Sequence, residues 1–396
     1  MKSWLQLLLI ALTLMICSNT YSQTNSKKLD KFFTKKLKKA QMAGMQVAFI
    51  NNGELGWVGS YGMKNDSTME KVNDSTLFMI ASCAKPVTAL GLMKLYDSEI
   101  ISLDDDINEY LPFKIVNPNF PEKSITIRMI LTHTSSFSDN IQLLNSLYTF
   151  QSGGDSPISI EQFIRGYFLP DGSYYNREKN FSSMVPGTNK SYCNAGYALA
   201  GYLIACITRK TFSEYMHQEI FRPLQMNESY WFLKDIPHTN ISTPHVYLGK
   251  LPTKQFRTIK PYGYPTVSDG QLRTNVTDYA EIVKLMLNDG KIGQIQFLKK
   301  TTIQTFLAVQ FPEVDKYQAI SWNYNEFDNW IYYLLMPRLP SHTGVDPGVA
   351  TVTSFDPKRK IGAIIFANTL THNFIGHKIL YQEMIRRLLK EAIKSN

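Results

Sequence analysis

The β-rich runs of this sequence lie near its two ends and leave a mostly helical middle. Near the front, residues 46–50 and 55–59 flank Asn51-Asn52-Gly53-Glu54, a turn sequence typical of a β-hairpin. Near the rear, three short β-rich runs predict strands, at residues 330–335, 349–355 and 361–366. This order predicts an α+β fold with one antiparallel sheet built from both chain ends and a mostly helical insertion.

Amphipathic helices are expected at both ends of the chain to cover that sheet. Leu29, Phe33 and Leu37 recur at helical spacing, among seven lysines at positions 27, 28, 31, 35, 36, 38 and 39. We expect these lysines to line the solvated face of the helix, although a lipid-surface or nucleic-acid contact is an alternative. Residues 375–393 predict a C-terminal helix. The middle predicts further helices, at residues 87–96, 198–207, 211–221 and 276–287.

The segment 138–185 is rich in Ser, Gly, Asn, Asp and Tyr and has few periodic apolar runs. It is expected to be a loop-rich excursion over a site rather than part of the core. The acidic turn Asp104-Asp105-Asp106 is expected to cap a helix rather than to bind a cation.

Composition excludes several classes of function. The formal net charge is +9, but the lysines concentrate in one helix and no basic–aromatic groove motif appears elsewhere, so no nucleic-acid partner is expected. The seven histidines and four cysteines lack metal-ligand spacing, so neither a metal nor a cofactor is expected. Without Cys17, an odd number of cysteines remains (Cys83, Cys193 and Cys206), which argues against a disulfide framework.

Residues 1–22 have the pattern of a secretory signal peptide. Lys2 precedes an apolar run from Trp4 to Ile16, and Thr20-Tyr21-Ser22 offers a cleavage site before Gln23. The run is shorter than the ~20 residues of a membrane span, and no second long apolar run follows. Export to the periplasm or the medium is therefore predicted. Lipid attachment at Cys17 is the less favoured alternative, because Ile16 fits poorly before such a cysteine.

A Ser-x-x-Lys pair, Ser82 and Lys85, stands at the start of the helix predicted at 87–96. Residues three apart share a helix face, so the Lys85 amine is expected beside the Ser82 hydroxyl and can take or relay its proton. Free N–H groups at a helix start can also stabilise a developing oxyanion. His133 is a second candidate base, although a hydrogen-bonded structural role suits its apolar surroundings better.

Two further motifs follow in order, Tyr192-x-Asn194 and His342-Thr343-Gly344. With Ser82-x-x-Lys85 they resemble the serine β-lactamase and penicillin-binding-protein superfamily, on the side of class C β-lactamases, D-aminopeptidases and related esterases. The resemblance covers roughly residues 28–392. Flanking segments also match the superfamily: residues 131–136, Pro186-Gly187-Thr188 and Pro347-Gly348.

The resemblance implies a role for each motif. Ser82 would attack a carbonyl, and Lys85 and Tyr192 would share the proton transfer, with the ammonium lowering the pKa of Tyr192. Asn194 would bind a substrate amide or Lys85. The backbone N–H groups of Ser82 and Val345 would form the oxyanion hole. The remaining substrate-binding residues would be His342, Thr343 and Gly344, on a sheet-edge strand.

Departures from the superfamily pattern leave the substrate open. His342 replaces the usual Lys, which favours esterase or peptidase chemistry over β-lactam turnover. Asp269-Gly270 and Val345-Asp346 replace Gly-Gly and Gly-Thr at the rim of the site. Substrate choice therefore cannot be taken over from relatives.

The resemblance predicts an exported serine hydrolase that cleaves an amide or ester of a small molecule or peptide, including cell-wall peptide. The alternatives are a cell-wall DD-carboxypeptidase or a class C-like β-lactamase and, from another class, a penicillin-binding sensor that acylates without turnover. The expected organisation is a signal peptide (1–22) and a catalytic domain (23–396). Within that domain, an α/β part (about 28–80 and 325–396) would enclose a helical part (about 81–324).

Overall fold

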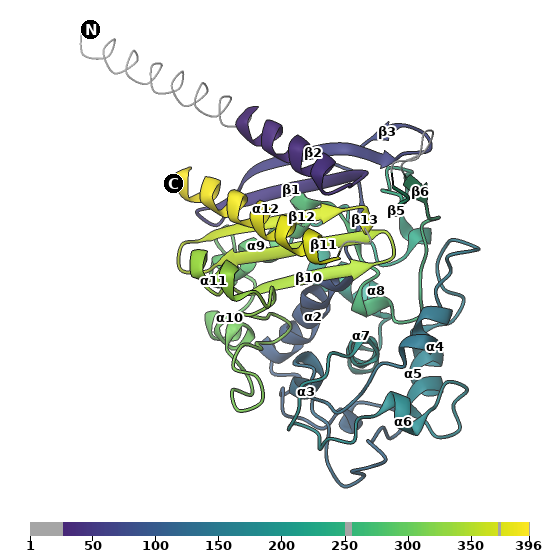
Figure 1. Ribbon diagram of the computed structural model, residues 1–396. Helices are drawn as coiled ribbons and strands as arrows, with labels where there is room; N and C mark the ends of the chain where they lie inside the picture. Colours follow the sequence, from purple (N-terminus) through teal and green to yellow (C-terminus); the bar gives the residue numbers. More distant parts are fainter. Residues whose placement is uncertain (1–26, 250–255, 371–373, 396) are drawn as a thin grey trace.

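The computed structural model describes residues 27–249, 256–370 and 374–395. Residues 1–22, predicted to be a signal peptide, and Cys17 lie outside these residues. The centre of the fold is a six-stranded sheet in the order β10-β11-β12-β1-β2-β3, and all of its strand pairs are antiparallel (Figure 1). The strands are β1 (Gly44–Asn51), β2 (Glu54–Asn65), β3 (Glu70–Lys71), β10 (Ser341–Asp346), β11 (Val349–Asp356) and β12 (Ile361–Ala367). The predicted α+β fold is confirmed.

The sheet joins the two ends of the chain at the pair β1–β12, where Met45 lies opposite Ala367. The predicted hairpin forms β1 and β2, and Asn52 and Gly53 adopt the left-handed conformation that its turn needs. Strand β10 lies at one edge of the sheet, so the backbone N–H and C=O groups on its outer side do not pair with another strand of that sheet.

Successive residues of β1 alternate between two cores. Val47 and Phe49 pack with the N-terminal helix (residues 27–39) and with α12 (Phe374–Lys394), whereas Ala48 and Ile50 belong to the core that contains α2 and α9. Figure 1 shows the N-terminal helix in purple and α12 in yellow on the same side of the sheet. The expected solvated face of lysines is found with one exception, the buried Lys36, which is ion-paired with Glu383.

The middle of the chain is mainly helical. Its elements are α2 (Lys85–Asp97), α3 (Ile127–Leu131), α4 (Ile141–Ser146), α5 (Ile160–Phe168), α6 (Arg177–Asn180), α7 (Asn194–Thr208), α8 (Phe212–Tyr215) with a π-helical continuation (Met216–Phe221), α9 (Val276–Leu287) and α10 (Lys300–Leu307). Short strands form three smaller sheets: β4 (Phe78–Met79) with β7 (Arg273–Thr274), β8 (Lys291–Ile292) with β9 (Ile295–Gln296), and β5 (His245–Tyr247) with β6 (Phe256–Thr258) and β13 (Thr369–Leu370). As expected, Asp106 caps a helix, the short 3-10 turn Ile107–Glu109.

Two sequence-based expectations about secondary structure and the core were wrong. The run Trp330–Leu335 is a helix, α11, and the outer edge of β10 is taken instead by Asn323, at Ser341, and by Glu326, at Thr343. The segment 138–185 contributes to the core through α5, which buries Phe163 and Tyr167. A capping box between Ser159 and Gln162 was the overlooked signal for that helix.

Candidate active site

Ser82 lies on a short 3-10 turn, Ala81–Ala84, that enters α2. The sequence placed Ser82 at the start of the helix itself, but α2 begins three residues later, at Lys85. Ala81 has a φ of 46°, a left-handed conformation that is strained for a residue with a side chain. The strained turn directly precedes the half-buried Ser82.

Lys85 is fully buried, and its amine makes three hydrogen bonds. It donates to Ser82 Oγ at 3.0 Å, to Asn194 Oδ1 at 2.7 Å and to the backbone oxygen of Asp269 at 2.8 Å. Burial lowers the pKa of Lys85, while the carboxylates of Asp269, Asp139 and Asp346 oppose that shift. A buried Lys85 amine is therefore more easily neutral than a lysine amine in water, and it lies directly beside the serine hydroxyl.

Tyr192 lies across the site from α2, with 46% of its surface exposed. Its ring centroid is 4.9 Å from Lys85 Nζ and 4.2 Å from the ring of His133. Desolvation raises the pKa of Tyr192 well above 10, and a hydrogen bond with Ser82 offsets this only in part. The sequence argument expected a lowered pKa, which is wrong for this arrangement because nearby carboxylates also disfavour a phenolate.

His133 has the structural role that its apolar surroundings suggested. It is buried, and its Nδ1 accepts a hydrogen bond from the backbone N–H of Cys193 at 3.1 Å. Burial lowers its pKa well below 6.5, so the imidazole is neutral at pH 7. His133 therefore positions the loop that carries Tyr192.

Asn194 is the first residue of α7, and its orientation depends on Asp139. Asp139 Oδ2 accepts hydrogen bonds from Asn194 N at 2.8 Å and from Asn194 Nδ2 at 2.9 Å. Asp139 Oδ1 accepts from Ala195 N at 3.0 Å. Because the carboxylate takes the amide nitrogen, the amide oxygen of Asn194 faces Lys85. Sequence analysis missed Asp139, which lies in the segment interpreted as a loop and carries no motif.

Strand β10 brings the third motif against the serine. A Cβ placed on Gly344 would lie 2.5 Å from the oxygen of Ile80 and 3.0 Å from the nitrogen of Ser82, so only glycine allows this approach. The backbone N–H of Thr343 points away from β11, toward Glu326. Alternation along a strand then directs the N–H of Val345 to the same free edge of β10.

Glu326 occupies the outer edge of β10 at Thr343. Its Oε1 accepts hydrogen bonds from Thr343 N at 2.8 Å and from Thr343 Oγ1 at 2.6 Å. His342, the preceding residue, is 4% exposed, and its Nδ1 lies 2.8 Å from the oxygen of Thr343. Burial lowers the pKa of His342, although Glu326 opposes the shift. Sequence analysis did not single out Glu326.

Two buried carboxyl groups complete the surroundings of Lys85. Burial raises the pKa of Asp269 to about 7, against the stabilising charge of Lys85. Burial likewise raises the pKa of Asp346 to about 7, and Tyr148 donates a hydrogen bond to its Oδ1 at 2.9 Å. Asp269 and Asp346 are two of the residues that differ from the superfamily pattern. In the structure they lie close enough to interact electrostatically.

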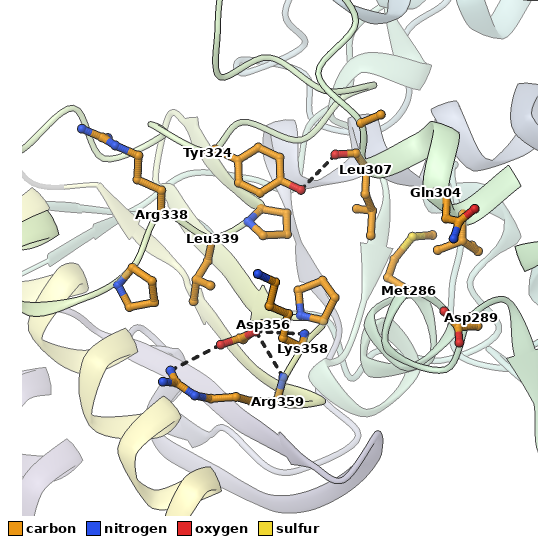
Figure 2. Close-up of a pocket in the computed structure, with 15 residues that line it drawn as sticks. Met286, Asp289, Gln304, Leu307, Tyr324, Arg338, Leu339, Asp356, Lys358 and Arg359 are labelled. Atoms are coloured by element: carbon orange, nitrogen blue, oxygen red, sulfur yellow. Dashed lines mark hydrogen bonds and ion pairs between the residues drawn. The ribbon is translucent and has the colours of Figure 1, made fainter. Parts of the chain in front are cut away.

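A separate cavity of about 630 Å³ lies between α9, α10 and the turn from β11 to β12 (Figure 2). Met286, Leu307 and Leu339 give it apolar walls, and Asp356 and Arg359 form an ion pair at its border. Its lining includes none of the site residues predicted from the sequence.

Cys83, Cys193 and Cys206 are free thiols. Within residues 27–249, 256–370 and 374–395, no three His, Cys, Asp or Glu side chains are grouped so that they could hold a metal ion. Nor does this described part of the chain contain a helix with the length and hydrophobicity needed to cross a membrane.

Comparison with known proteins gives a consistent picture. A family model described as Beta-lactamase matches residues 29–383. Protein flp of Staphylococcus aureus (strain N315) is 23% identical over 348 residues, which are 87% of this chain and 63% of the relative. The chain therefore spans less than two thirds of that relative's length. Penicillin-binding protein 4* of Bacillus subtilis is 27% identical over 207 residues, 52% of this chain and 42% of that protein.

Solved structures share the fold at low sequence identity. A D-amino acid amidase from Ochrobactrum anthropi has a TM-score of 0.71 at 18% identity and covers 93% of this chain and 98% of its own. An octameric penicillin-binding protein homologue from Pyrococcus abyssi has a TM-score of 0.66 at 21% identity. The match covers 87% of this chain and 73% of that homologue.

Proposed function

Because the chain belongs to the β-lactamase family, whose members are generally serine hydrolases, we propose that it hydrolyses an amide or ester through an acyl group on Ser82. The observation that carries this proposal is the 3.0 Å hydrogen bond between Lys85 Nζ and Ser82 Oγ. A serine hydroxyl becomes an effective nucleophile only when a neighbouring group takes its proton. A buried amine with a lowered pKa is such a group.

In the acylation step, Ser82 Oγ forms a bond to the carbonyl carbon while its proton passes to Lys85 Nζ. The carbonyl oxygen becomes an oxyanion, which the backbone N–H groups of Ser82 and Val345 stabilise. Each donor of this kind typically contributes ~3–4 kcal/mol. The bond to the leaving group then breaks, and that group departs with a proton relayed from Lys85 through the Tyr192 hydroxyl.

In the second step, water attacks the acyl group, its proton returns through Lys85, and Ser82 Oγ is released as the hydroxyl. Lys85 thus serves as the base in both steps. Tyr192 donates and passes on protons without becoming a stable phenolate, since its pKa lies well above 10. Asn194 and Asp139 hold the Lys85 amine in place between turnovers.

We also propose that the protein is exported, on the strength of Lys2 and the apolar run from Trp4 to Ile16. Residues 23–396 would then form the catalytic domain. Its substrate is a small molecule or a peptide, including peptides of the cell wall. No nucleic acid, metal or cofactor takes part in the proposed reaction.

Labelling with a fluorescent phosphonate, together with hydrolysis of a nitrophenyl ester, tests the proposal. We expect the wild type to be labelled and to turn over, and Ser82→Ala to lose both while its thermal unfolding stays close to that of the wild type. Labelling that persists in Ser82→Ala would place the nucleophile elsewhere. A wild type that labels at Ser82 but stalls after one turnover would instead match the alternative of a penicillin-binding sensor.

A further inference from the structure

The sequence resemblance implies that the edge strand with His342, Thr343 and Gly344 binds substrate, but here a carboxylate of the protein itself is already bound at Thr343. Glu326 Oε1 accepts both hydrogen bonds that Thr343 offers at this edge, from the backbone N–H and from the hydroxyl. Charge-assisted hydrogen bonds of this length are strong. Any anionic group approaching Thr343 would have to displace Glu326 and would be repelled by its charge.

The chain on both sides of Glu326 is anchored, so the carboxylate is held in this position. Asn323 exchanges backbone hydrogen bonds with Ser341 at 3.0 and 3.2 Å, which fastens the segment to the start of β10. After Glu326, the buried side chain of Phe327 packs on Tyr332, with 4.8 Å between ring centroids. The contact with Thr343 is therefore part of the packed structure.

Glu326 is also close to the reactive serine. Thr343 is followed by Gly344, whose Cβ position lies 3.0 Å from the nitrogen of Ser82. The charge of Glu326 acts on both His342 and Tyr192, two residues of the candidate site. His342, the residue in place of the usual Lys, is uncharged at neutral pH and so does not offset it.

We propose that Glu326 is a specificity-determining residue, which excludes substrates that present a carboxylate along β10 and favours those that present an ammonium group there. This inference rests on the proposed hydrolase function. Three further acidic residues act electrostatically on Lys85, the amine beside the serine: Asp139, Asp269 and Asp346. The substrate class is thus a neutral or cationic amide or ester, which differs from a cell-wall peptide with a free C-terminal carboxylate.

The test uses matched nitrophenyl esters that end in a methyl, a carboxylate or a trimethylammonium group. One set carries this group in the acyl chain and a second set carries it on the leaving phenol, since either part of the substrate can lie along β10. For the wild type we expect kcat/KM to be about ten-fold lower for the carboxylate than for the methyl ester in at least one set. That ratio corresponds to ~1.4 kcal/mol. The trimethylammonium ester should equal or exceed the methyl ester.

Glu326→Gln keeps the size of the side chain and removes its charge. This variant should raise the ratio of kcat/KM for the carboxylate ester to kcat/KM for the methyl ester about ten-fold. It should lower the corresponding ratio for the trimethylammonium ester. Glu326→Ser is a second charge-removing variant, and Glu326→Asp, which keeps the charge, should retain the wild-type ranking. The control Glu122→Gln removes the same charge from an exposed loop and should leave both ratios unchanged.

A wild type that prefers the carboxylate ester in both sets overturns the inference, whichever variants fold. The inference is also overturned if a folded Glu326→Gln or Glu326→Ser protein hydrolyses the methyl ester with the same kcat/KM ratios between esters as the wild type. In that case the proposed hydrolase function still stands. If the wild type hydrolyses none of the esters and is not labelled at Ser82, the proposed function fails and this inference fails with it.

Discussion

Asp139 accepts hydrogen bonds from both nitrogens of Asn194, the backbone nitrogen at 2.8 Å and the side-chain nitrogen at 2.9 Å. This contact fixes which end of the Asn194 amide faces Lys85. It also places a carboxylate near the buried amine, where its charge raises the pKa of Lys85 against the effect of burial. One side chain outside the three motifs thus controls both the geometry and the charge of the proposed base.

Asp139→Asn should lower kcat about ten- to hundred-fold, because Asn194 loses its fixed orientation. Loss of the carboxylate should also lower the pKa of Lys85, so the acidic limb of the profile of kcat/KM against pH should move to lower pH. A purely structural residue would leave that limb in place. Asp171→Asn, on an exposed loop, is the control, and an unmoved limb in Asp139→Asn would contradict the electrostatic role.

Tyr192→Phe should lower kcat by ~10²-fold or more and still show an acidic limb in kcat/KM. The limb should remain because it reports deprotonation of Lys85, whose pKa lies below 10.5, and a phenolate of Tyr192 would form only well above pH 10. Measuring the pH profiles of both proteins on one nitrophenyl ester checks this. Disappearance of the limb in Tyr192→Phe would identify Tyr192 as the base.

Gly344→Ala should lower kcat at least ~10²-fold with a folded protein, since the added Cβ would lie 2.5 Å from the Ile80 oxygen and push β10 away from Ser82. The matched control is Gly196→Ala in α7, where the nearest atom to an added Cβ is 3.7 Å away. There alanine should retain activity and add up to ~1 kcal/mol of helix stability. Equal activities of the two variants would argue against an oxyanion hole between Ser82 and Val345.

Asp346→Asn should change how stability depends on pH. The folded-state pKa of Asp346 is raised to about 7 from 3.8, so its protonated form stabilises the fold fully below pH 3.8 and this contribution is lost as pH rises through 7. Asparagine does not titrate. The free energy of unfolding, measured by urea denaturation from pH 5 to 8, should therefore fall by about 2–3 kcal/mol less in the variant than in the wild type.

Part of that decline should remain in Asp346→Asn, because Asp269 has a similar raised pKa and is still present. Parallel stability curves for variant and wild type would show that Asp346 titrates normally in the folded protein.

The order of motifs and the distribution of β-rich runs predicted the sheet, the terminal helices and the meeting of Ser82, Lys85 and Asn194. What the sequence missed depends on contacts between distant residues. Asp139 lies 55 positions from Asn194, and Glu326 lies 17 positions from Thr343, and no spacing rule links either pair. The pKa of Tyr192 was predicted in the wrong direction because a motif shows the neighbouring amine but not the desolvation around the phenol.

The run Trp330–Leu335 shows a second limit of sequence patterns. Its composition favours a strand, but strand formation requires a partner, and whether a sheet edge is free is a property of the whole fold. The capping box at Ser159, by contrast, was a local signal that sequence analysis overlooked. Local rules thus identify helix starts better than they identify which apolar runs enter the sheet.

The pairing of β1 with β12 has a consequence for when the protein can act. Met45 in β1 lies opposite Ala367 in β12, and the strand that packs against Ser82 also comes from the last part of the sequence. Such long-range pairing is slow to form. A nascent chain therefore carries Ser82 and Lys85 without β10 beside them, and we expect reactivity only once the final strands have been synthesised. The order of synthesis itself would then delay the reactivity of Ser82 until the whole chain has been made.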